Sequence, residues 1–245
     1  EMEAAGCAVE PDELRAFGDK LDVRIRDLTE QIYHDADGEF NINSPKQLGE
    51  VLFEKLGLHA PKKTKTGYST NADVLESLMD KHPIVPLITE YRALTKLQNT
   101  YVTGLLKVVG EDGRIHSTFK QTETRTGRIS SAEPNIQNIP VRTPLGREMR
   151  RFFTAKDGYL LVDADYSQIE LRVLAHISGD EIMKKAFLDG VDIHTVTASQ
   201  VFNQPIEWVT PDLRSKAKAV NFGIVYGIGK QQNIKIRRIG IAVYA

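Results

Sequence analysis

Two acidic side chains at the end of an apolar run could bind a metal ion. The segment DADYSQIELR, residues 163–172, follows the apolar run 159–162 and begins with Asp163 and Asp165. Alternation along a strand would direct both carboxylates to the same face. Carboxylates at such a position suit Mg²⁺, which prefers oxygen ligands and retains waters or phosphate oxygens. The alternative is that Asp165 only caps the helix that follows it.

A second segment, RSKAKAVNFGIVYG at residues 214–227, carries basic and aromatic residues at regular spacing. Arg214, Lys218, Phe222 and Tyr226 recur at every fourth position with no proline between them. A helix would present them as one gently curving stripe. Arg and Lys bind phosphates and aromatic rings stack on bases, so the stripe has the order of a nucleoside triphosphate. The alternative is an ordinary amphipathic helix with basic surface residues and aromatic core residues.

A third segment, TGRISSAEPNIQNIP at residues 126–140, is polar and rich in Gly, Ser, Asn and Pro. This composition favours a loop or a short helix. Polar donors on an irregular segment are suited to contacting phosphates and groove edges of nucleic acid. The candidate donors are Arg128, Asn135, Gln137 and Asn138. The alternative is a polar loop without a ligand.

The elements that position these residues begin with long helices. Apolar residues at steps of three and four predict an amphipathic helix over residues 11–36. Its apolar face comprises Leu14, Phe17, Leu21, Ile25, Leu28 and Ile32. Ser44 as N-cap, Pro45 at the first helical position and Gln47 predict a second helix that starts with a capping box. A third helix is predicted over residues 85–107.

The pattern changes at residues 110–118, where we predict a domain boundary. The stretch GRIHSTFKQTE alternates like a strand, and a further strand is predicted at residues 159–165. Helices are then predicted near residues 168–177, 181–188, 193–202 and 211–227. The sequence therefore predicts an α+β fold, with a helical region followed by a mixed one.

The composition of the 245 residues, 41% hydrophobic and 27% charged, is typical of soluble globular proteins. No apolar run approaches the roughly 20 residues that span a bilayer, so we expect no membrane partner. The single cysteine, Cys7, cannot form an internal disulfide and suits a reducing compartment. Residues 1–60 hold 6 Lys/Arg against 14 Asp/Glu, whereas residues 210–245 hold 7 against 1. This asymmetry indicates a polyanionic partner for the later part, with chance variation as the alternative.

The three segments together resemble the signature motifs of family A DNA polymerases, those similar to bacterial DNA polymerase I. Four further stretches resemble that family in the same order: FNINSPKQLGEVLFEKLGL, TEYRALTKLQNTY, DGRIHSTFKQTETRTGRISS and DIHTVTASQVF. The resemblance implies a helical thumb at residues 1–115, a partial palm sheet at 116–190 and the beginning of a helical fingers subdomain at 191–229. Residues 230–245 form a tail that departs from the family.

The resemblance also implies roles for single residues. Asp165 would bind two Mg²⁺ ions beside the carbonyl of Tyr166, and Asp165 and Lys218 would be catalytic. Glu170 would crowd the sugar position and pair with Tyr226, which excludes ribonucleotides. The residues at the incoming deoxynucleoside triphosphate would be Gln168, Glu170, His194, Arg214, Lys218, Phe222 and Tyr226. The residues on the primer-template DNA would be Arg128, Asn135, Gln137, Asn138 and Arg172.

The implied reaction is attack of a primer 3′ hydroxyl on the α-phosphate of a deoxynucleoside triphosphate, assisted by two metal ions. The family supplies the second metal carboxylate from a His-Asp-Glu turn, and the 245 residues contain no such triplet. We therefore expect this chain alone to be weakly active or inactive, and to self-associate through its incomplete palm. The alternatives are a catalytically inactive nucleic-acid-binding remnant and an unrelated Mg²⁺ phosphohydrolase built on Asp163 and Asp165. The implied location is the bacterial cytoplasm, at the nucleoid, in replication or in repair.

Overall fold

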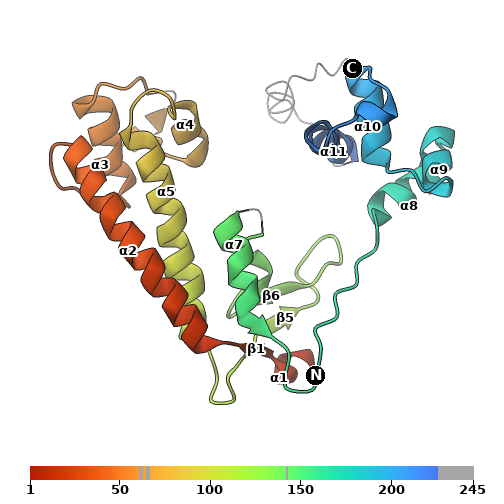
Figure 1. Ribbon diagram of the computed structural model, residues 1–245, viewed down its shortest axis with the longest axis horizontal. Coiled ribbons are helices and arrows are strands. Elements are labelled where there is room, and N and C mark those ends of the chain that lie inside the picture. Colours follow the sequence, from red (N-terminus) through yellow and green to blue (C-terminus); the bar gives the residue numbers. More distant parts are fainter. Residues whose placement is uncertain (61–62, 65–66, 142, 226–245) are drawn as a thin grey trace. The chain divides into compact units, whose positions relative to one another are not determined.

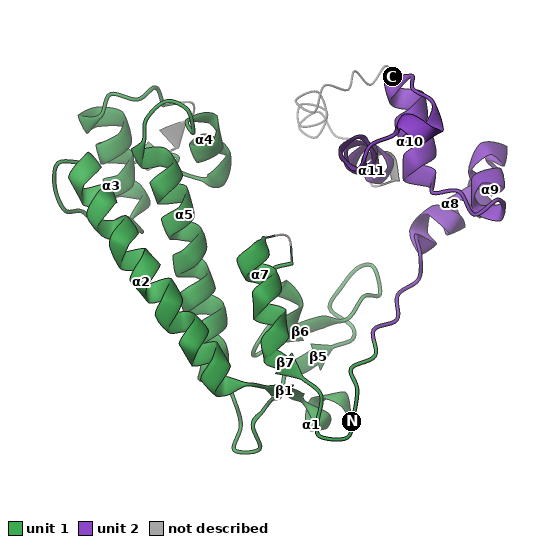
Figure 2. Ribbon diagram, in the orientation of Figure 1, with its two compact units in different colours: residues 1–162 green, residues 163–245 purple. Residues whose placement is uncertain are grey.

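The computed structural model describes residues 1–60, 63–64, 67–141 and 143–225 (Figure 1). The chain divides into two compact units, residues 1–162 and 163–245 (Figure 2). Helices predominate and the sheets are small, in agreement with the predicted α+β class. No helix among the described residues is long and apolar enough to cross a membrane.

The first unit is mainly helical. Its α-helices are α1 (Met2–Ala5), α2 (Pro11–Asp35), α3 (Pro45–Gly49), α4 (Ala72–Ser77), α5 (Ile84–Lys96), α6 (Gly104–Leu106) and α7 (Pro144–Met149). The π-helical and 3₁₀ segments are η1 (Glu50–Lys55), η2 (Leu97–Thr103), η3 (Ile136–Asn138) and η4 (Arg150–Phe152). The helix predicted over residues 85–107 is confirmed, because α5, η2 and α6 follow one another without a break.

The two long helices α2 and α5 lie side by side (Figure 1). The predicted apolar face of α2 is confirmed, since five of its six residues are buried and Ile25 is half-buried. Leu94 of α5 and Tyr101 of η2 pack in the same core. Arg24 joins the helices at their surface, because its Nε and Nη2 donate to the two Glu90 carboxylate oxygens at 2.8 and 2.9 Å.

The start of α3 confirms the predicted cap but not the capping box. The Ser44 hydroxyl accepts a hydrogen bond of 3.4 Å from the Gln47 N–H, and Pro45 is the first helical residue. The Gln47 side chain, however, accepts from the N–H of Asn41 at 2.7 Å. It is not needed at the Ser44 N–H, because that group already donates to the Asn41 carbonyl at 2.9 Å.

Three small sheets complete the first unit. Strand β1 (Cys7–Val9) is central in one, antiparallel to β4 (Arg114–Ile115) and β7 (Phe153–Thr154). The others pair β2 (Lys63–Thr64) with β3 (Gly67–Tyr68) and β5 (Thr118–Lys120) with β6 (Ser130–Ala132). The strand predicted for GRIHSTFKQTE is thus present as the short β4 and β5. Strand β1 thus pairs with a strand inside the predicted boundary region, residues 110–118, and with one after it, and the division of the chain into a thumb, palm and fingers stays a prediction.

The strand predicted at residues 159–165 is wrong. None of the described strands pairs with this segment, and Tyr159, Leu160, Leu161 and Val162 are 69%, 88%, 70% and 88% exposed. An apolar run indicates a tendency to be buried, but a strand also needs a neighbour for its backbone N–H and C=O groups. The shared-face argument for Asp163 and Asp165 therefore does not hold in this structure.

The described residues of the second unit, 163–225, form α8 (Ile169–Ser178), α9 (Glu181–Leu188), α10 (Ile193–Phe202), η5 (Ile206–Trp208) and α11 (Pro211–Val225). These positions confirm the predicted helices, except that residues 226–227 lie outside the described residues. Leu171 of α8, Ala186 of α9 and Ile193 of α10 form its small core, and α10 packs along α11.

Candidate nucleotide-binding site

Three of the four residues of the predicted stripe lie on α11. Arg214 and Lys218 are exposed and Phe222 is half-buried. The Nζ of Lys218 is 5.8 Å from the centroid of the Phe222 ring, a cation–π distance. The helix therefore carries positive charge in its first half and an aromatic face in its second. Tyr226 lies outside the described residues.

His194 of α10 packs against this stripe. It is buried, and its ring centroid is 5.8 Å from that of Phe222 at an interplanar angle of 41°. The Nδ2 of Asn221 donates to its Nδ1 at 2.9 Å, so a neutral ring carries its proton on Nε2. Burial lowers the pKa of His194; the charge of Asp192 opposes this, and the positive charges of α11 add to it. The imidazole is therefore a neutral donor through Nε2 at physiological pH.

Asp192, which is not among the predicted site residues, is the centre of a polar cluster. The Nε and Nη2 of Arg214 donate to its two oxygens at 2.7 and 3.2 Å. The Nε2 of Gln168 donates at 2.8 Å, and the N–H and hydroxyl of Thr195 donate at 3.1 and 2.8 Å. Burial alone would raise the pKa of Asp192, but the hydrogen bonds from Arg214, Thr195 and Gln168 bring this pKa well below its usual range. The carboxylate is therefore ionised at neutral pH.

The sequence could have indicated Asp192 as a helix cap, although not as part of a site. It precedes α10 directly, and an Asp before the first helical residue is a common N-cap. Its contact with Arg214, 22 residues away, has no local signal, because only the packing of α10 on α11 creates it. The same holds for Asn221, whose partner His194 is 27 residues away.

Gln168 and Glu170 lie at the start of α8. Gln168 adopts the left-handed region with φ of 55° and precedes the first residue of the helix. Its side chain joins this helix start to Asp192. Glu170 is half-buried in the first turn. Its predicted partner, Tyr226, lies outside the described residues, so that pairing stays a prediction.

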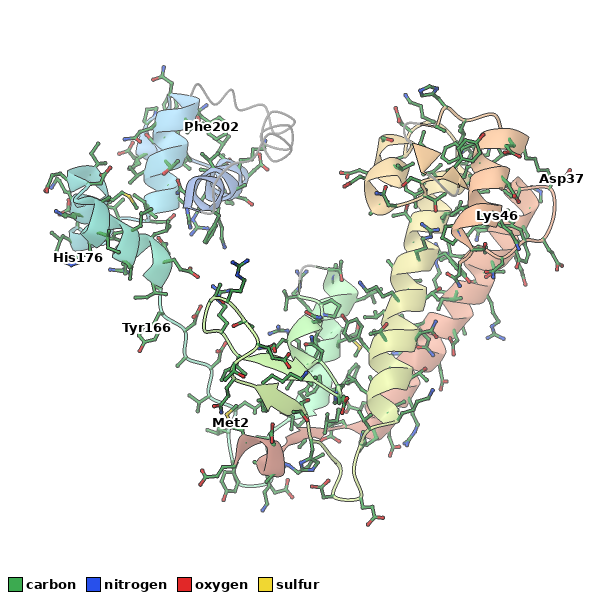
Figure 3. All side chains as sticks on the ribbon, turned by 180° about the vertical axis from the view of Figure 1, so that it is seen from behind. Met2, Asp37, Lys46, Tyr166, His176 and Phe202 are labelled. Carbon is green, nitrogen blue, oxygen red and sulfur yellow. The ribbon has the colours of Figure 1, made fainter. Side chains whose placement is uncertain are left out.

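Asp165 and Tyr166 lie on the exposed segment that leads into α8. Tyr166 is 80% exposed, and its side chain projects away from the chain in Figure 3. The alternative in which Asp165 caps the helix is wrong, because α8 begins at Ile169 after Gln168. Within the described part of the chain, the carboxylate of Asp165 makes no hydrogen bond or ion pair. The Asp165 carboxylate is therefore exposed to solvent and accessible to a ligand.

The described residues do not form a complete metal site. Among them, no three His, Cys, Asp or Glu side chains come together closely enough to hold an ion. Asp165 offers one carboxylate and Tyr166 one carbonyl, and waters and phosphate oxygens would complete the octahedral coordination of Mg²⁺. The predicted two-ion site stays a prediction.

The predicted DNA-contacting loop is stabilised by hydrogen bonds of two of its side-chain amides. Gln137 Oε1 accepts from the Ser131 N–H at 3.0 Å, and its Nε2 donates to the Ile129 carbonyl at 2.9 Å. The Asn135 side chain caps η3 by accepting from the Gln137 N–H at 3.1 Å. Asn135 and Gln137 thus shape the loop, while Arg128 is exposed in the connection between β5 and β6.

The other two predicted DNA contacts, Asn138 and Arg172, are also exposed. The Asn138 carbonyl accepts a hydrogen bond from the Tyr101 hydroxyl, which attaches the loop to η2. The Arg172 guanidinium lies 4.7 Å from the centroid of the Phe187 ring, and its Nε donates to the Ser167 carbonyl at 2.9 Å. Contact of these residues with DNA stays a prediction.

Comparison with known proteins decides the family. The family model of DNA polymerase family A matches residues 11–239. The chain belongs to the family A DNA polymerases. The family uses divalent metal ions such as Mg²⁺.

Relatives of this family A chain are similar over nearly all of its residues. It is 55% identical to DNA polymerase I of Caldicellulosiruptor bescii and 54% identical to that of Bacillus subtilis, each over 97% of the chain. It is 52% identical to the thermostable DNA polymerase I of Thermus thermophilus over 93% of the chain. In each case the chain spans 28% of the relative's length. The resemblance found in the sequence is thus confirmed.

A solved structure gives the same result for the fold of this family A chain. It is described as the POL domain of Pol1 from M. smegmatis in complex with DNA primer-template and dNTP. The TM-score is 0.87 at 44% sequence identity, over 96% of this chain and 42% of that chain. The fold is therefore that of part of a polymerase domain.

Proposed function

We propose that the chain takes part in template-directed DNA synthesis, by binding the incoming deoxynucleoside triphosphate and the primer-template. The observation that carries the proposal is the arrangement of Arg214, Lys218 and Phe222 along α11, with His194 of α10 packed against Phe222. Membership of the family supports the proposal. So does the similar POL domain from M. smegmatis, which was solved with DNA primer-template and dNTP.

Each group of the stripe has a function suited to its chemistry. Arg214 provides a planar fork for phosphate oxygens, and Lys218 provides a compact charge that stabilises the negative charge developing on the leaving pyrophosphate. Phe222 offers a flat face for the base and sugar. The neutral His194 donates from Nε2 to a phosphate oxygen. Asp165 is the accessible carboxylate of the predicted metal site.

We extend the proposal to the subdomains and to the residues that contact DNA. Residues 1–115 act as the thumb, 116–190 as part of the palm and 191–229 as part of the fingers, and Arg128 and Arg172 contact the primer-template. This function would be exercised at the bacterial nucleoid.

Equilibrium binding of a deoxynucleoside triphosphate to the 245-residue chain tests the proposal. Arg214→Ala and Lys218→Ala are expected to weaken binding by about tenfold each, the usual effect of losing a hydrogen bond to a charged group. Lys216→Ala is the matched control, because Lys216 lies on the same helix but pairs with Asp212 at 2.8 Å. Failure of the wild-type chain to bind the nucleotide would contradict the proposal.

A second candidate is a nucleic-acid-binding chain without catalytic activity of its own. It is favoured by the incomplete set of metal ligands among the described residues and by the absence of a His-Asp-Glu triplet from the 245 residues. Primer extension with Mg²⁺ and all four nucleotides separates the candidates. We expect little or no extension by these 245 residues alone. Robust extension would remove this candidate.

A further inference from the structure

We propose that Asp192 is a positioning residue for the incoming nucleotide, which holds Arg214 and Gln168 in the orientation that nucleotide binding requires. The inference rests on the proposed function of Arg214. The Asp192 carboxylate contacts three parts of the second unit: Gln168 before α8, Thr195 in the first turn of α10, and Arg214 in α11. These parts carry the predicted nucleotide-binding residues.

The Asp192 carboxylate is fixed independently of Arg214. Asp192 is the N-cap of α10, and the N–H and hydroxyl of Thr195 donate to Oδ2 at 3.1 and 2.8 Å. The Gln168 amide donates to Oδ1 at 2.8 Å. Three neutral donors therefore hold the acceptor in place, and the long side chain of Arg214 is the mobile partner that this acceptor orders.

The contact uses only one edge of the guanidinium. Nε and Nη2 donate to the two carboxylate oxygens, which occupies two of the five N–H groups. The Nη1 group and the second Nη2 hydrogen form another edge of the same planar group, suited to a second bidentate contact with phosphate oxygens. Arg214 is 45% exposed, so this edge is accessible. A guanidinium ordered in advance loses less conformational entropy when a phosphate binds.

The contact with Gln168 extends this positioning to the start of α8. Gln168 is three residues beyond Asp165 in the sequence and has a left-handed backbone, with φ of 55°. Its hydrogen bond to Asp192 holds this unfavourable conformation in place. Asp192 therefore joins the segment that carries Asp165 to the helix that carries Arg214.

The test is Asp192→Asn in the full 245-residue chain. Asn is about as good an N-cap as Asp, so α10 keeps its first turn. The variant loses the charge and one of the two oxygens that hold Arg214. Asp180→Asn is the matched control: Asp180 caps α9 by accepting from the Met183 N–H at 2.8 Å and makes no ion pair among the described residues.

Two affinities are measured for each variant in the presence of primer-template: that of the templated deoxynucleoside triphosphate and that of the corresponding deoxynucleoside. Asp192→Asn is expected to weaken triphosphate binding by about tenfold and to leave deoxynucleoside binding unchanged. Asp180→Asn is expected to change neither. An equal loss for both ligands would indicate a purely structural role for Asp192 and would overturn the inference.

A double-mutant cycle completes the test. Because Asp192 acts mainly through Arg214, the loss of triphosphate affinity in the double variant Asp192→Asn/Arg214→Ala should be clearly smaller than the sum of the two single losses. Additive losses would overturn the inference. If Asp192→Asn binds the triphosphate as tightly as the wild type, or more tightly because repulsion has been removed, only the inference fails. If the wild-type chain binds no triphosphate, the proposed function fails first.

Discussion

Asn221 joins α10 to α11 through two hydrogen bonds: its Nδ2 donates to Nδ1 of His194 at 2.9 Å, and its Oδ1 accepts from the Thr197 hydroxyl at 3.0 Å. His194 is buried, so loss of its donor leaves an unsatisfied nitrogen away from water. We expect Asn221→Ala to lower the free energy of unfolding by about 1–3 kcal/mol. Urea unfolding followed by the fluorescence of Trp208, the only tryptophan, measures it.

The control for this variant is Ser215→Ala, an exposed position on the same helix. It should change the free energy of unfolding by no more than about 0.5 kcal/mol. Equal stability of the Asn221→Ala and Ser215→Ala variants would show that the α10–α11 contact does not depend on Asn221.

His116 predicts a pH dependence of stability in the first unit. The pKa of His116 is raised by its hydrogen bond to the Glu3 carbonyl and by that to Asp112, against the opposing effects of desolvation and, less strongly, of the charge of Arg114. A raised pKa means that the folded state binds the proton more tightly than the unfolded state. The additional stability is present below the unfolded-state pKa, about 6.5, and is lost as the pH rises through the higher folded-state pKa.

Thermal unfolding of the wild type and of His116→Gln, between pH 5.5 and pH 9, tests this dependence. Glutamine keeps a donor and an acceptor but does not titrate. The wild type should have the higher melting temperature at low pH, and the difference should vanish at high pH. A difference that is independent of pH would show that the His116 charge does not contribute.

The apolar run 159–162 predicts self-association of this chain. Leu160 is 88% exposed, and contiguous exposed apolar residues favour association. We expect the wild type to form oligomers at high concentration and Leu160→Lys to reduce them, as measured by light scattering. Leu188→Lys is the matched control, because Leu188 is 87% exposed but lies on α9, outside the run. A monomeric wild type would contradict the prediction.

The cap of α3 predicts a graded effect at Ser44. Its hydroxyl accepts from the Gln47 N–H, so Ser44→Ala should lower the free energy of unfolding by about 1 kcal/mol, whereas Ser44→Gly should lower it by only a few tenths. Chemical unfolding of the three proteins measures both. Alanine and glycine variants of equal stability would show that the cap does not contribute.

The helices could be predicted from the sequence because each carries its own periodic signal. The apolar steps of α2 and the cap at Ser44 are local, and both are found where expected. Strands depend on partners elsewhere in the chain. Thus β1, with three residues, gave no signal, and the apolar run 159–162 gave a strong signal without a described partner.

In the candidate site, too, the sequence predicts local features but not contacts between distant residues. The spacing of Arg214, Lys218 and Phe222 is local to one helix, and α11 contains all three. The contacts of Asp192 with Arg214 and of Asn221 with His194 join residues more than twenty positions apart. Only the packing of α10 against α11 creates them, so no spacing rule could have indicated these pairs.

The most direct test of the proposed function is the formation of a complex that depends on the templated nucleotide. A fluorescently labelled primer-template is titrated with the 245-residue chain, alone and with each deoxynucleoside triphosphate in turn, and anisotropy reports the bound fraction. We predict that only the nucleotide complementary to the template base tightens DNA binding, and that Lys218→Ala requires about tenfold more of this nucleotide for the same effect while leaving binding to DNA alone intact. Equal effects of all four nucleotides, or of none, would contradict the assignment of α11 as the nucleotide-binding helix.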